Sequence, residues 1–279
     1  MSRVLLTGAS SGIGEAAALL LAKNHQVVAT VRTPEARAIL LEAASDAGVS
    51  LEVVLVDVTD RGGVEGVVAD MEVTGGIDVL LHNAGTGYVG TLEQIDFSKL
   101  REAMEVNFFG AAQVVQAVLP QMRVRGAGKV IVVSSIGGAV GQPFNDAYCA
   151  AKFAVEGLLE SLHPVAASVG VSISIVEPGP VATKFIANLQ GLDEVLSGDP
   201  NDPYASAKAN YMSRLGSPER MAGMQTSMDV AEVLVDIVND PSPKLRYQTS
   251  PWSTDFVATK LSDLDGSAVA QMTGDWVAD

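Results

Sequence analysis

Residues 7–14 read Thr-Gly-Ala-Ser-Ser-Gly-Ile-Gly, and this stretch decides the fold. The apolar run Val4 to Leu6 before it predicts a strand, and Glu15 to Lys23 after it predicts a helix. Glycines permit a tight turn between these two elements and a close approach of the backbone to a ligand. Because the amide groups and the positive dipole end of the helix face this turn, the stretch predicts a site for an anion.

Two interpretations of the glycine turn follow from the residues. A tight turn without a ligand would explain the glycines, whose spacing differs from the usual Gly-x-Gly-x-x-Gly pattern. The strand, turn and helix open a strand-helix-strand unit, however, and this context favours a dinucleotide. The residues expected to bind it here are Gly8, Ser10, Ser11, Gly12, Ile13 and Gly14.

Short, continuously apolar runs alternate with longer helical stretches along the chain. Such runs are typical of strands that helices cover on both faces. The further predicted strands are Gln26 to Val31, Leu51 to Val56, Val79 to Leu81, Val130 to Val133 and Ser172 to Val176. The predicted helices include Gly14 to Lys23, Arg101 to Met122 and Tyr148 to Val169. The pattern predicts an α/β fold with a doubly wound parallel sheet of the Rossmann type.

The chain is interpreted as a single domain of residues 1–279, long enough to bury a sizeable core. Glycines and prolines break the regular alternation within residues 184–228, which we interpret as a small, mobile substrate cap. Pro164 is expected to kink or stop the long helix that contains it.

The carboxyl-terminal part of the chain gives weaker signals. Asp229 to Val238 is expected to form a helix with Asp229 as its N-cap. Lys244 to Thr249 is expected to form a final edge strand. The tail from Pro251 onward is amphiphilic, and no role is assigned to it.

The composition argues against several classes of function. The formal net charge is −15, so the chain offers no global attraction to nucleic acid or to an anionic membrane. One cysteine and three scattered histidines predict neither an intrachain disulfide nor a metal site. The amino terminus lacks the pattern of a signal peptide, and the apolar runs are far shorter than the roughly 20 residues that span a bilayer. We therefore expect a cytoplasmic protein.

The end of the second predicted strand bears on which dinucleotide binds. An acidic residue there would contact the adenosine ribose hydroxyls, whereas a cation accommodates a 2′-phosphate. The strand ends Ala-Thr-Val-Arg-Thr without an acid, and Arg32 offers a planar set of donors to a phosphate. With the hydroxyls of Ser11 and Thr33, Arg32 predicts NADP(H) over NAD(H). The alternative for Arg32 is a solvated surface charge.

Two further strand ends carry candidate cofactor contacts. Asp57 could accept a hydrogen bond from the adenine amino group while Val58 packs on the ring, or Asp57 could be an ordinary helix N-cap. The next strand leads into Asn83, Ala84 and Gly85, where small residues let the chain pass under a ribose. Asn83 either braces the sheet there or has a purely structural role.

Tyr148 and Lys152 share one face of a predicted helix, about one turn apart. A fixed cation nearby favours the phenolate, and lowering the tyrosine pKa by roughly three units corresponds to about 4 kcal/mol. This amount is expected from Lys152 acting together with the positive nicotinamide of the cofactor. Tyr148 is then expected to give or take a proton as a hydride moves. A surface helix with an extended lysine would show the same spacing. Ser134 and Ser135, which end a predicted parallel strand upstream, favour the catalytic interpretation because such folds bind ligands there.

These motifs together resemble those of the short-chain dehydrogenase/reductase family. The stretches TGASSGIG, HNAG, VNFFGA and YCAAK match that family's motifs in order, over roughly residues 1–185. The resemblance implies that Ser135, rather than Ser134, hydrogen-bonds the substrate oxygen and that Tyr148 transfers the proton. It also implies that Lys152 binds the nicotinamide ribose and tunes Tyr148, while Asn107 holds a water in a proton relay. From the residues alone, Asn107 could equally be a polar core residue that kinks a helix.

The stretch Glu-Pro-Gly-Pro-Val-Ala-Thr at residues 177–183 resembles the family's nicotinamide-side loop. The resemblance implies that Val181 donates a backbone hydrogen bond to the carboxamide and that Thr183 contacts the carboxamide or a phosphate. Pro178 and Gly179 belong to the same expected cofactor site. The alternative is a rigid turn that leads into the cap.

The substrate is expected to be a hydrophobic secondary alcohol or ketone. The stretches GQPFNDAYCAAKFAVEGLLESL and EPGPVATKF resemble the 17β-hydroxysteroid dehydrogenase type 1 and retinol dehydrogenase branch, which implies a steroid, a retinoid or a similar carbonyl compound. A bacterial-type ketone reductase is an equal alternative. Apolar cap residues suit a pocket or a core, namely Phe185, Leu189, Leu192, Tyr204, Tyr211, Met212, Leu215, Met221, Met224 and Met228.

Two other functional classes and an assembly state are also considered. A catalytically idle nucleotide-binding regulator would not need the residues Asn107, Ser135, Tyr148 and Lys152. A lyase or epimerase on the same fold is a third interpretation. Long apolar helices favour a homodimer or homotetramer.

Overall fold

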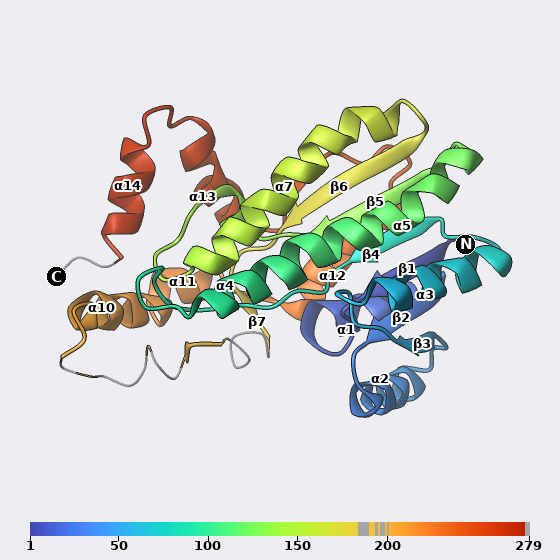
Figure 1. Cartoon of the computed structure of the whole chain (residues 1–279), viewed down its shortest axis with the longest axis horizontal. Coiled ribbons are helices and arrows are strands. Elements are labelled where there is room, and N and C mark those ends of the chain that lie inside the picture. The colour runs from blue at the N-terminus through green and yellow to red at the C-terminus, as the bar shows by residue number, and fades with distance from the viewer. Residues whose placement is uncertain (184–189, 193–194, 196–198, 200, 277–279) are drawn as a thin grey trace.

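A seven-stranded parallel sheet forms the centre of the protein, with the order β3-β2-β1-β4-β5-β6-β9 (Figure 1). The computed structural model describes residues 1–183, 190–192, 195, 199 and 201–276. The strands are β1 (Arg3–Thr7), β2 (Gln26–Val31), β3 (Glu52–Leu55), β4 (Val79–His82), β5 (Gly128–Val133), β6 (Val171–Glu177) and β9 (Arg246–Gln248). Each predicted strand, including the carboxyl-terminal edge strand, is present, so the predicted doubly wound α/β fold is confirmed.

Helices cover both faces of the sheet (Figure 1). One face packs against α3 (Arg61–Val73), α5 (Gly110–Arg125) and α7 (Asp146–Ala167). The other packs against α1 (Gly12–Leu21), α2 (Pro34–Asp46) and α12 (Ser227–Asn239). Neighbouring strand residues divide between the two cores: Leu80 lies in the first and Leu81 in the second. Successive side chains of a strand point to opposite faces, so a strand buried on both sides has a continuously apolar sequence.

The single helix predicted from Arg101 to Met122 is wrong in its bounds. The structure has α4 (Phe97–Met104), one π-helical turn (Glu105–Phe109) and then α5. Asn107 lies in that turn and is almost fully buried, and its Nδ2 donates to the Ala103 carbonyl oxygen over 3.0 Å. The polar side chain thus bonds to backbone inside the helix, where π-turns are frequently associated with functional sites.

Two expectations about helix ends need correction. α7 continues to Ala167, three residues past Pro164, so the proline does not stop the helix. Pro164 lies near the carboxyl end of α7, so the hydrogen bond lost with its missing N–H affects only the last part of the helix. The N-cap of α12 is Thr226, and Asp229 completes a capping box as its third residue.

The end of the molecule beyond the strand carboxyl ends holds the cap and the tail (Figure 1). Described cap residues form α10 (Ala205–Leu215), α11 (Pro218–Ala222) and β8 (Gln225–Thr226), which pairs with β7 (Val181–Ala182). Phe185 and Leu189, both expected to line the cap, lie outside the described residues. The tail forms α13 (Pro251–Leu261) and α14 (Ser267–Gly274).

A third apolar cluster joins these elements to the catalytic end of the sheet. Its buried residues are Val89, Ile136, Val140, Phe144, Val195, Tyr211, Phe256, Val257 and Trp276. Tyr204, Met212 and Leu215 of the cap pack against it, whereas Met221 and Met228 are exposed. The tail without an assigned role therefore helps to bury the described part of the cap. Within the described ranges, no helix has the length and apolar character of a membrane span.

Candidate active site

The predicted site residues lie together at the carboxyl ends of neighbouring strands. Gly8 follows β1, Asn83 follows β4, Ser135 follows β5 and Pro178 follows β6. These four strands are consecutive neighbours in the sheet and run in the same direction. The carboxyl edge of a doubly wound sheet is where such folds bind ligands.

Two glycines of the turn, Gly8 and Gly14, are packed too tightly to carry a side chain. Gly8 has a φ of +73°, and a Cβ on it would lie 2.6 Å from the Cα of Ala84. A Cβ on Gly14 would lie 2.1 Å from the Gly8 carbonyl oxygen. Asn83 donates from Nδ2 to that same oxygen over 2.8 Å, so it braces the turn as the sequence suggested.

The turn also leaves groups that fit a pyrophosphate. Ser11 is the N-cap of α1, but its side chain makes no capping hydrogen bond, so the hydroxyl and the first amide groups of α1 are available to an anion. Gly12 has a φ of +62°, and a Cβ there would lie 3.3 Å from Thr183. Thr183 of the predicted nicotinamide-side loop is thus brought next to the glycine turn. Ser10 and Ile13 belong to the same turn and helix start.

The residues after β2 are exposed at the same edge. Arg32 is exposed, and no ion pair links it to another described side chain. Thr33 is the N-cap of α2, and its Oγ1 accepts a hydrogen bond of 3.2 Å from the Ala36 amide. Arg32 is therefore free to meet a phosphate, while the Thr33 hydroxyl already has a structural partner.

Asp57 is not the N-cap of α3, because that position belongs to Asp60. The Asp57 carboxylate instead accepts hydrogen bonds from the backbone amide and the hydroxyl of Thr59, at 2.9 and 2.8 Å. Val58 is buried, and a Cβ on Gly110 would lie 2.9 Å from its Cγ2. The Val58 side chain thus packs against α5, and its expected contact with an adenine ring stays a prediction.

The two serines after β5 point to different partners. Ser134 is buried and donates from Oγ to Glu156 Oε1 over 2.6 Å. Ser135 is the N-cap of the short helix α6 (Ile136–Ala139), and its Oγ accepts from the Gly137 amide over 3.0 Å. The Ser135 side chain also forms a hydrogen bond with Tyr148. Ser135 is thus the serine that contacts Tyr148, and its contact with a substrate oxygen stays a prediction.

Tyr148 and Lys152 lie one turn apart on α7, as predicted. The Lys152 Nζ lies 5.8 Å from the centre of the Tyr148 ring and donates to the Val133 carbonyl oxygen over 3.0 Å. Lys152 is 5% exposed, so it is not an extended surface lysine. The alternative of a surface helix is therefore wrong.

Lys152 alone does not produce the lowered tyrosine pKa that was expected from the lysine and the nicotinamide together. Burial raises the pKa of Tyr148 well above its usual value, and the hydrogen bond from Ser135 offsets only part of this effect. Burial also lowers the pKa of Lys152 to about 8, against the charge of Glu156, which raises it. Desolvation is the largest cause of both shifts, and for Tyr148 it favours the neutral phenol.

Asn107 lies across the site from these residues. Its Nδ2 donates to the Thr86 carbonyl oxygen over 2.9 Å, and its Oδ1 accepts from the Thr86 amide over 3.1 Å. A Cβ on Gly85 would lie 2.8 Å from Asn107 Oδ1 and 3.6 Å from Lys152 Nζ. Gly85 thus leaves open space between the asparagine and the lysine.

Three contacts near the site were not anticipated. Asn145, just before α7, donates to the hydroxyl of Tyr211 in the cap over 2.8 Å. Phe144 has a φ of 59° and packs on the Tyr211 ring at 5.2 Å. His82 is buried near Lys152, and burial lowers its pKa to about 3, so it stays neutral. No local sequence signal links Tyr211 to Asn145, because the two are far apart in the chain.

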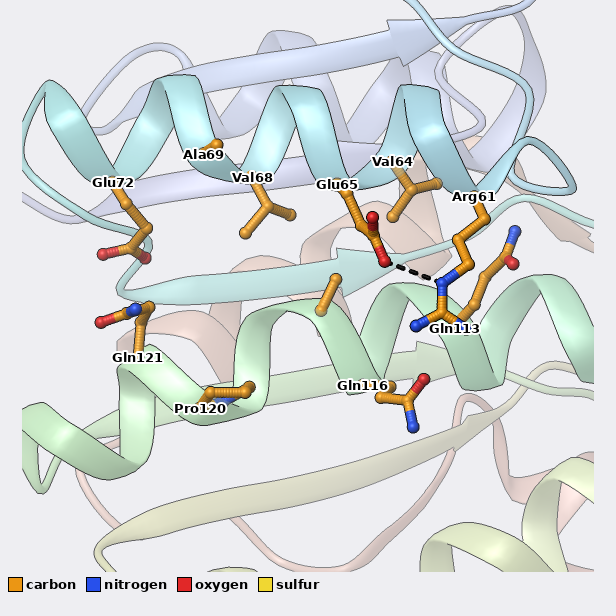
Figure 2. Close-up of a pocket in the computed structure, with 11 residues that line it drawn as sticks. Arg61, Val64, Glu65, Val68, Ala69, Glu72, Gln113, Gln116, Pro120 and Gln121 are labelled. Atoms are coloured by element: carbon orange, nitrogen blue, oxygen red, sulfur yellow. Dashed lines mark hydrogen bonds and ion pairs between the residues drawn. The ribbon is translucent and has the colours of Figure 1, made fainter.

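A groove away from the predicted site lies between α3 and α5 (Figure 2). It has a volume of about 530 Å³, and Arg61 pairs with Glu65 at one end of it. None of the predicted site residues lines this groove. Among the described residues, no cluster of His, Cys, Asp and Glu suits a metal ion.

Residues 2–191 match the family described as short chain dehydrogenase. The chain belongs to this family. It is 38% identical to retinol dehydrogenase 8 of Bos taurus over 95% of this chain and 86% of that protein. It is 39% identical to 17-beta-hydroxysteroid dehydrogenase type 1 of Homo sapiens over 95% of this chain and 82% of that protein. Both relatives belong to the branch whose motifs the sequence resembles.

The fold likeness extends over the whole chain. A crystal structure of a short-chain dehydrogenase from Streptomyces avermitilis superposes with a TM-score of 0.78 at 30% identity. The match covers 100% of this chain and 98% of that one. The protein is therefore an oxidoreductase of the short-chain dehydrogenase family, whose members use a nicotinamide cofactor.

Proposed function

We propose that this protein is an NADPH-dependent reductase that converts a hydrophobic ketone to a secondary alcohol, with Tyr148 as the proton donor. One observation carries the proposal. Buried Lys152 and half-buried Ser135 and Tyr148 lie together at the carboxyl ends of the strands, and the tyrosine hydroxyl is hydrogen-bonded to the serine. Because burial holds Tyr148 as a phenol, it is in the form that a general acid requires at neutral pH.

The side chains divide the work of the reduction. Ser135 hydrogen-bonds the substrate oxygen, and Tyr148 gives that oxygen its proton as the carbonyl carbon receives a hydride. Bound NADPH supplies the hydride. The phenolate left on Tyr148 would be costly in this buried place, and the Lys152 ammonium offsets that cost before a proton returns from solvent. Asn107 holds a water of the proton relay, in the space that Gly85 leaves beside Lys152.

The residues present fit the cofactor at both ends. The glycine turn excludes side chains, and the first amides of α1 face the place where a pyrophosphate would lie. Arg32 is an exposed cation after β2, and it supports a preference for the 2′-phosphate of NADP(H). The remaining residues proposed to bind it are Gly8, Ser10, Ser11, Gly12, Ile13, Gly14, Thr33, Asp57, Val58, Asn83, Ala84, Gly85, Tyr148, Lys152, Pro178, Gly179, Val181 and Thr183.

The substrate class rests on the relatives and on the third apolar cluster. The relatives are named for retinol and for a hydroxysteroid, both hydrophobic alcohols. Tyr211, Phe256 and Trp276 give the end of the molecule beyond the sheet an apolar interior. We propose a substrate of similar hydrophobic character. We also propose that the protein is cytoplasmic and forms a homo-oligomer.

Tyr148→Phe tests the proposed proton donor. We expect the rate of NADPH-dependent ketone reduction to fall by roughly 10²- to 10⁴-fold, the usual contribution of a general acid, while NADPH still binds. Tyr247→Phe is the matched control, because it also removes a hydrogen-bonded tyrosine hydroxyl. The partners of that hydroxyl, Lys244 and Asp240, are not among the proposed site residues. Unchanged reduction by the Tyr148→Phe variant, measured against a panel of ketones, would refute the assignment.

A further inference from the structure

Glu156 is a buried carboxylate directly behind the predicted catalytic residues. It follows Lys152 by one turn of α7 and is 3% exposed. Its Oε1 accepts the hydrogen bond from Ser134, the neighbour of Ser135, over 2.6 Å. The carboxylate thus contacts the strand end that carries one proposed catalytic residue, from the helix that carries two others.

The protein is built to admit this carboxylate. A Cβ on Gly138 would lie 2.0 Å from Glu156 Oε1 and 2.5 Å from Ser134 Oγ. No side chain fits at Gly138 while the carboxylate keeps its place. Gly138 therefore serves the Glu156 site, a role that the glycine-rich sequence around it did not reveal.

Arg246 of the edge strand β9 holds the Glu156 carboxylate in place by an ion pair. Its guanidinium pairs with Glu156 and with Glu177, which is fully buried at the end of β6. It also pairs with the exposed Glu160 over 2.7 Å. Two buried carboxylates thus share one arginine. Buried ion pairs seldom stabilise a fold as well as apolar side chains of similar size, so stability alone does not explain this group.

The charge of Glu156 acts on both partners in the site. Its carboxylate raises the pKa of Lys152 against the desolvation that lowers it, and it also raises the pKa of Tyr148. The pKa of Glu156 itself is raised by burial and by the neighbouring Glu177, and Ser134 and Arg246 offset only part of this rise. The carboxylate also raises the pKa of Lys260 on α13, which burial lowers. Removing the carboxylate would lower the pKa of the lysine and the phenol together.

We propose that Glu156 is a positioning residue whose negative charge, held in place by Arg246 and Ser134, keeps Lys152 and Tyr148 protonated until Tyr148 donates its proton to the carbonyl oxygen. The inference rests on the proposed function. Glu156 touches neither substrate nor cofactor, and it acts through the two residues on its own helix. The segment after the cap, which supplies Arg246, thereby helps to set the pH range of the site.

The test is the pH profile of kcat/KM for ketone reduction by Glu156→Gln. Reduction needs both protonated groups, so its rate falls at high pH as either loses its proton. We expect this alkaline limb to move to lower pH in Glu156→Gln by on the order of one unit. Glu160→Gln is the matched control, because Glu160 pairs with the same Arg246 but is exposed. Its limb should coincide with that of the unaltered protein.

Two further measurements separate charge from shape. Glu156→Asp keeps the charge, so its alkaline limb should stay near the original pH even if kcat falls. An unmoved limb in Glu156→Gln, or an equal shift in Glu160→Gln, would overturn the proposal. Glu156→Gln should still fold, because its amide can accept from Ser134 and Arg246 keeps Glu160 and Glu177 as partners. Loss of folding would show a structural role instead.

A spectroscopic titration tests the inference without turnover. The NMR resonance of the Lys152 Cε, assigned by its absence from Lys152→Met, follows ionisation of Lys152, whose pKa is about 8. In Glu156→Gln this resonance should titrate at lower pH. If the protein reduces no ketone, the proposed function fails while this titration still decides whether Glu156 controls Lys152. An unshifted titration would refute that control.

Discussion

Asn83 donates a hydrogen bond of 2.8 Å to the carbonyl oxygen of Gly8 and so ties the glycine turn to the end of strand β4. The amide side chain replaces a strand-to-strand bond at the point where β1 and β4 separate. Its partner Gly8 has a positive φ, a backbone conformation that glycine adopts without strain. The turn is therefore held in place before any cofactor binds, which lowers the cost of ordering it on binding.

Gly8→Ala should damage both folding and cofactor binding. The added Cβ meets the Ala84 backbone at 2.6 Å, and the positive φ alone costs about 1–3 kcal/mol for other residues. Urea unfolding should show a free energy of unfolding lower by at least this amount. Gly66→Ala is the control, because a Cβ in that helix meets nothing within 4 Å. It should stabilise the protein by about 0.5–1 kcal/mol. A Gly8→Ala variant of unaltered stability would contradict the packing described here.

Arg32→Ala should weaken NADPH binding far more than NADH binding. A hydrogen bond to a charged group contributes about 1.5–3 kcal/mol, which corresponds to roughly 10- to 100-fold in Kd. NADH lacks the 2′-phosphate and should lose little affinity. Arg37→Ala, an exposed arginine further along the same helix start, should change neither affinity. Fluorescence titration with both cofactors measures this, and equal losses would rule out the phosphate contact.

Lys152 should make stability rise with pH in the alkaline range. Its pKa in the folded protein is about 8, below the usual 10.5, so between these values the unfolded chain binds a proton that the folded protein does not. Stability therefore increases as pH rises from about 8 toward 10.5. Comparison of the unaltered protein with Lys152→Met isolates this effect, because the variant lacks the group. A difference in unfolding free energy that stays constant over this range would contradict the shift.

Phe256→Ala should show that the carboxyl-terminal tail belongs to the folded domain. The side chain is buried in the third cluster, where its ring stacks on Trp252 at 5.2 Å and on Trp276 at 5.9 Å. Truncation of such a ring costs about 3–5 kcal/mol. Phe97→Ala removes a ring that is 58% exposed, so it should cost far less. Equal, small losses in thermal unfolding of the two variants would place the tail outside the cooperative unit.

The parts of the fold that the sequence predicted are local ones. The second predicted strand agrees residue for residue with β2 (Gln26–Val31), because strands buried on both faces carry a continuous apolar signal. Tyr148 and Lys152 share a helix face because the spacing of α7 places them there. Glu156, one turn further along the same face, carried the same signal and was overlooked.

Other features depended on competing contacts that the sequence does not rank. Asp57, Asp60 and Asp229 are all suitable N-caps, and only the path of the chain selected Asp60 and replaced Asp229 by Thr226. For a similar reason, Lys152 alone does not give the lowered tyrosine pKa that was expected from the lysine and the nicotinamide together. Spacing shows that two groups are near, whereas the depth of burial around them determines which protonated form is favoured.

By itself the sequence determined the sheet, the glycine turn and the tyrosine-lysine pair, because each is encoded within a few consecutive residues or one helical turn. The tertiary structure alone decided that Arg246, 90 residues after Glu156, closes the charge network behind the site. It also decided that the tail packs on the cap and that Ser134 and Ser135 take different partners. Contacts between distant segments depend on how whole layers pack, and no local pattern specifies them.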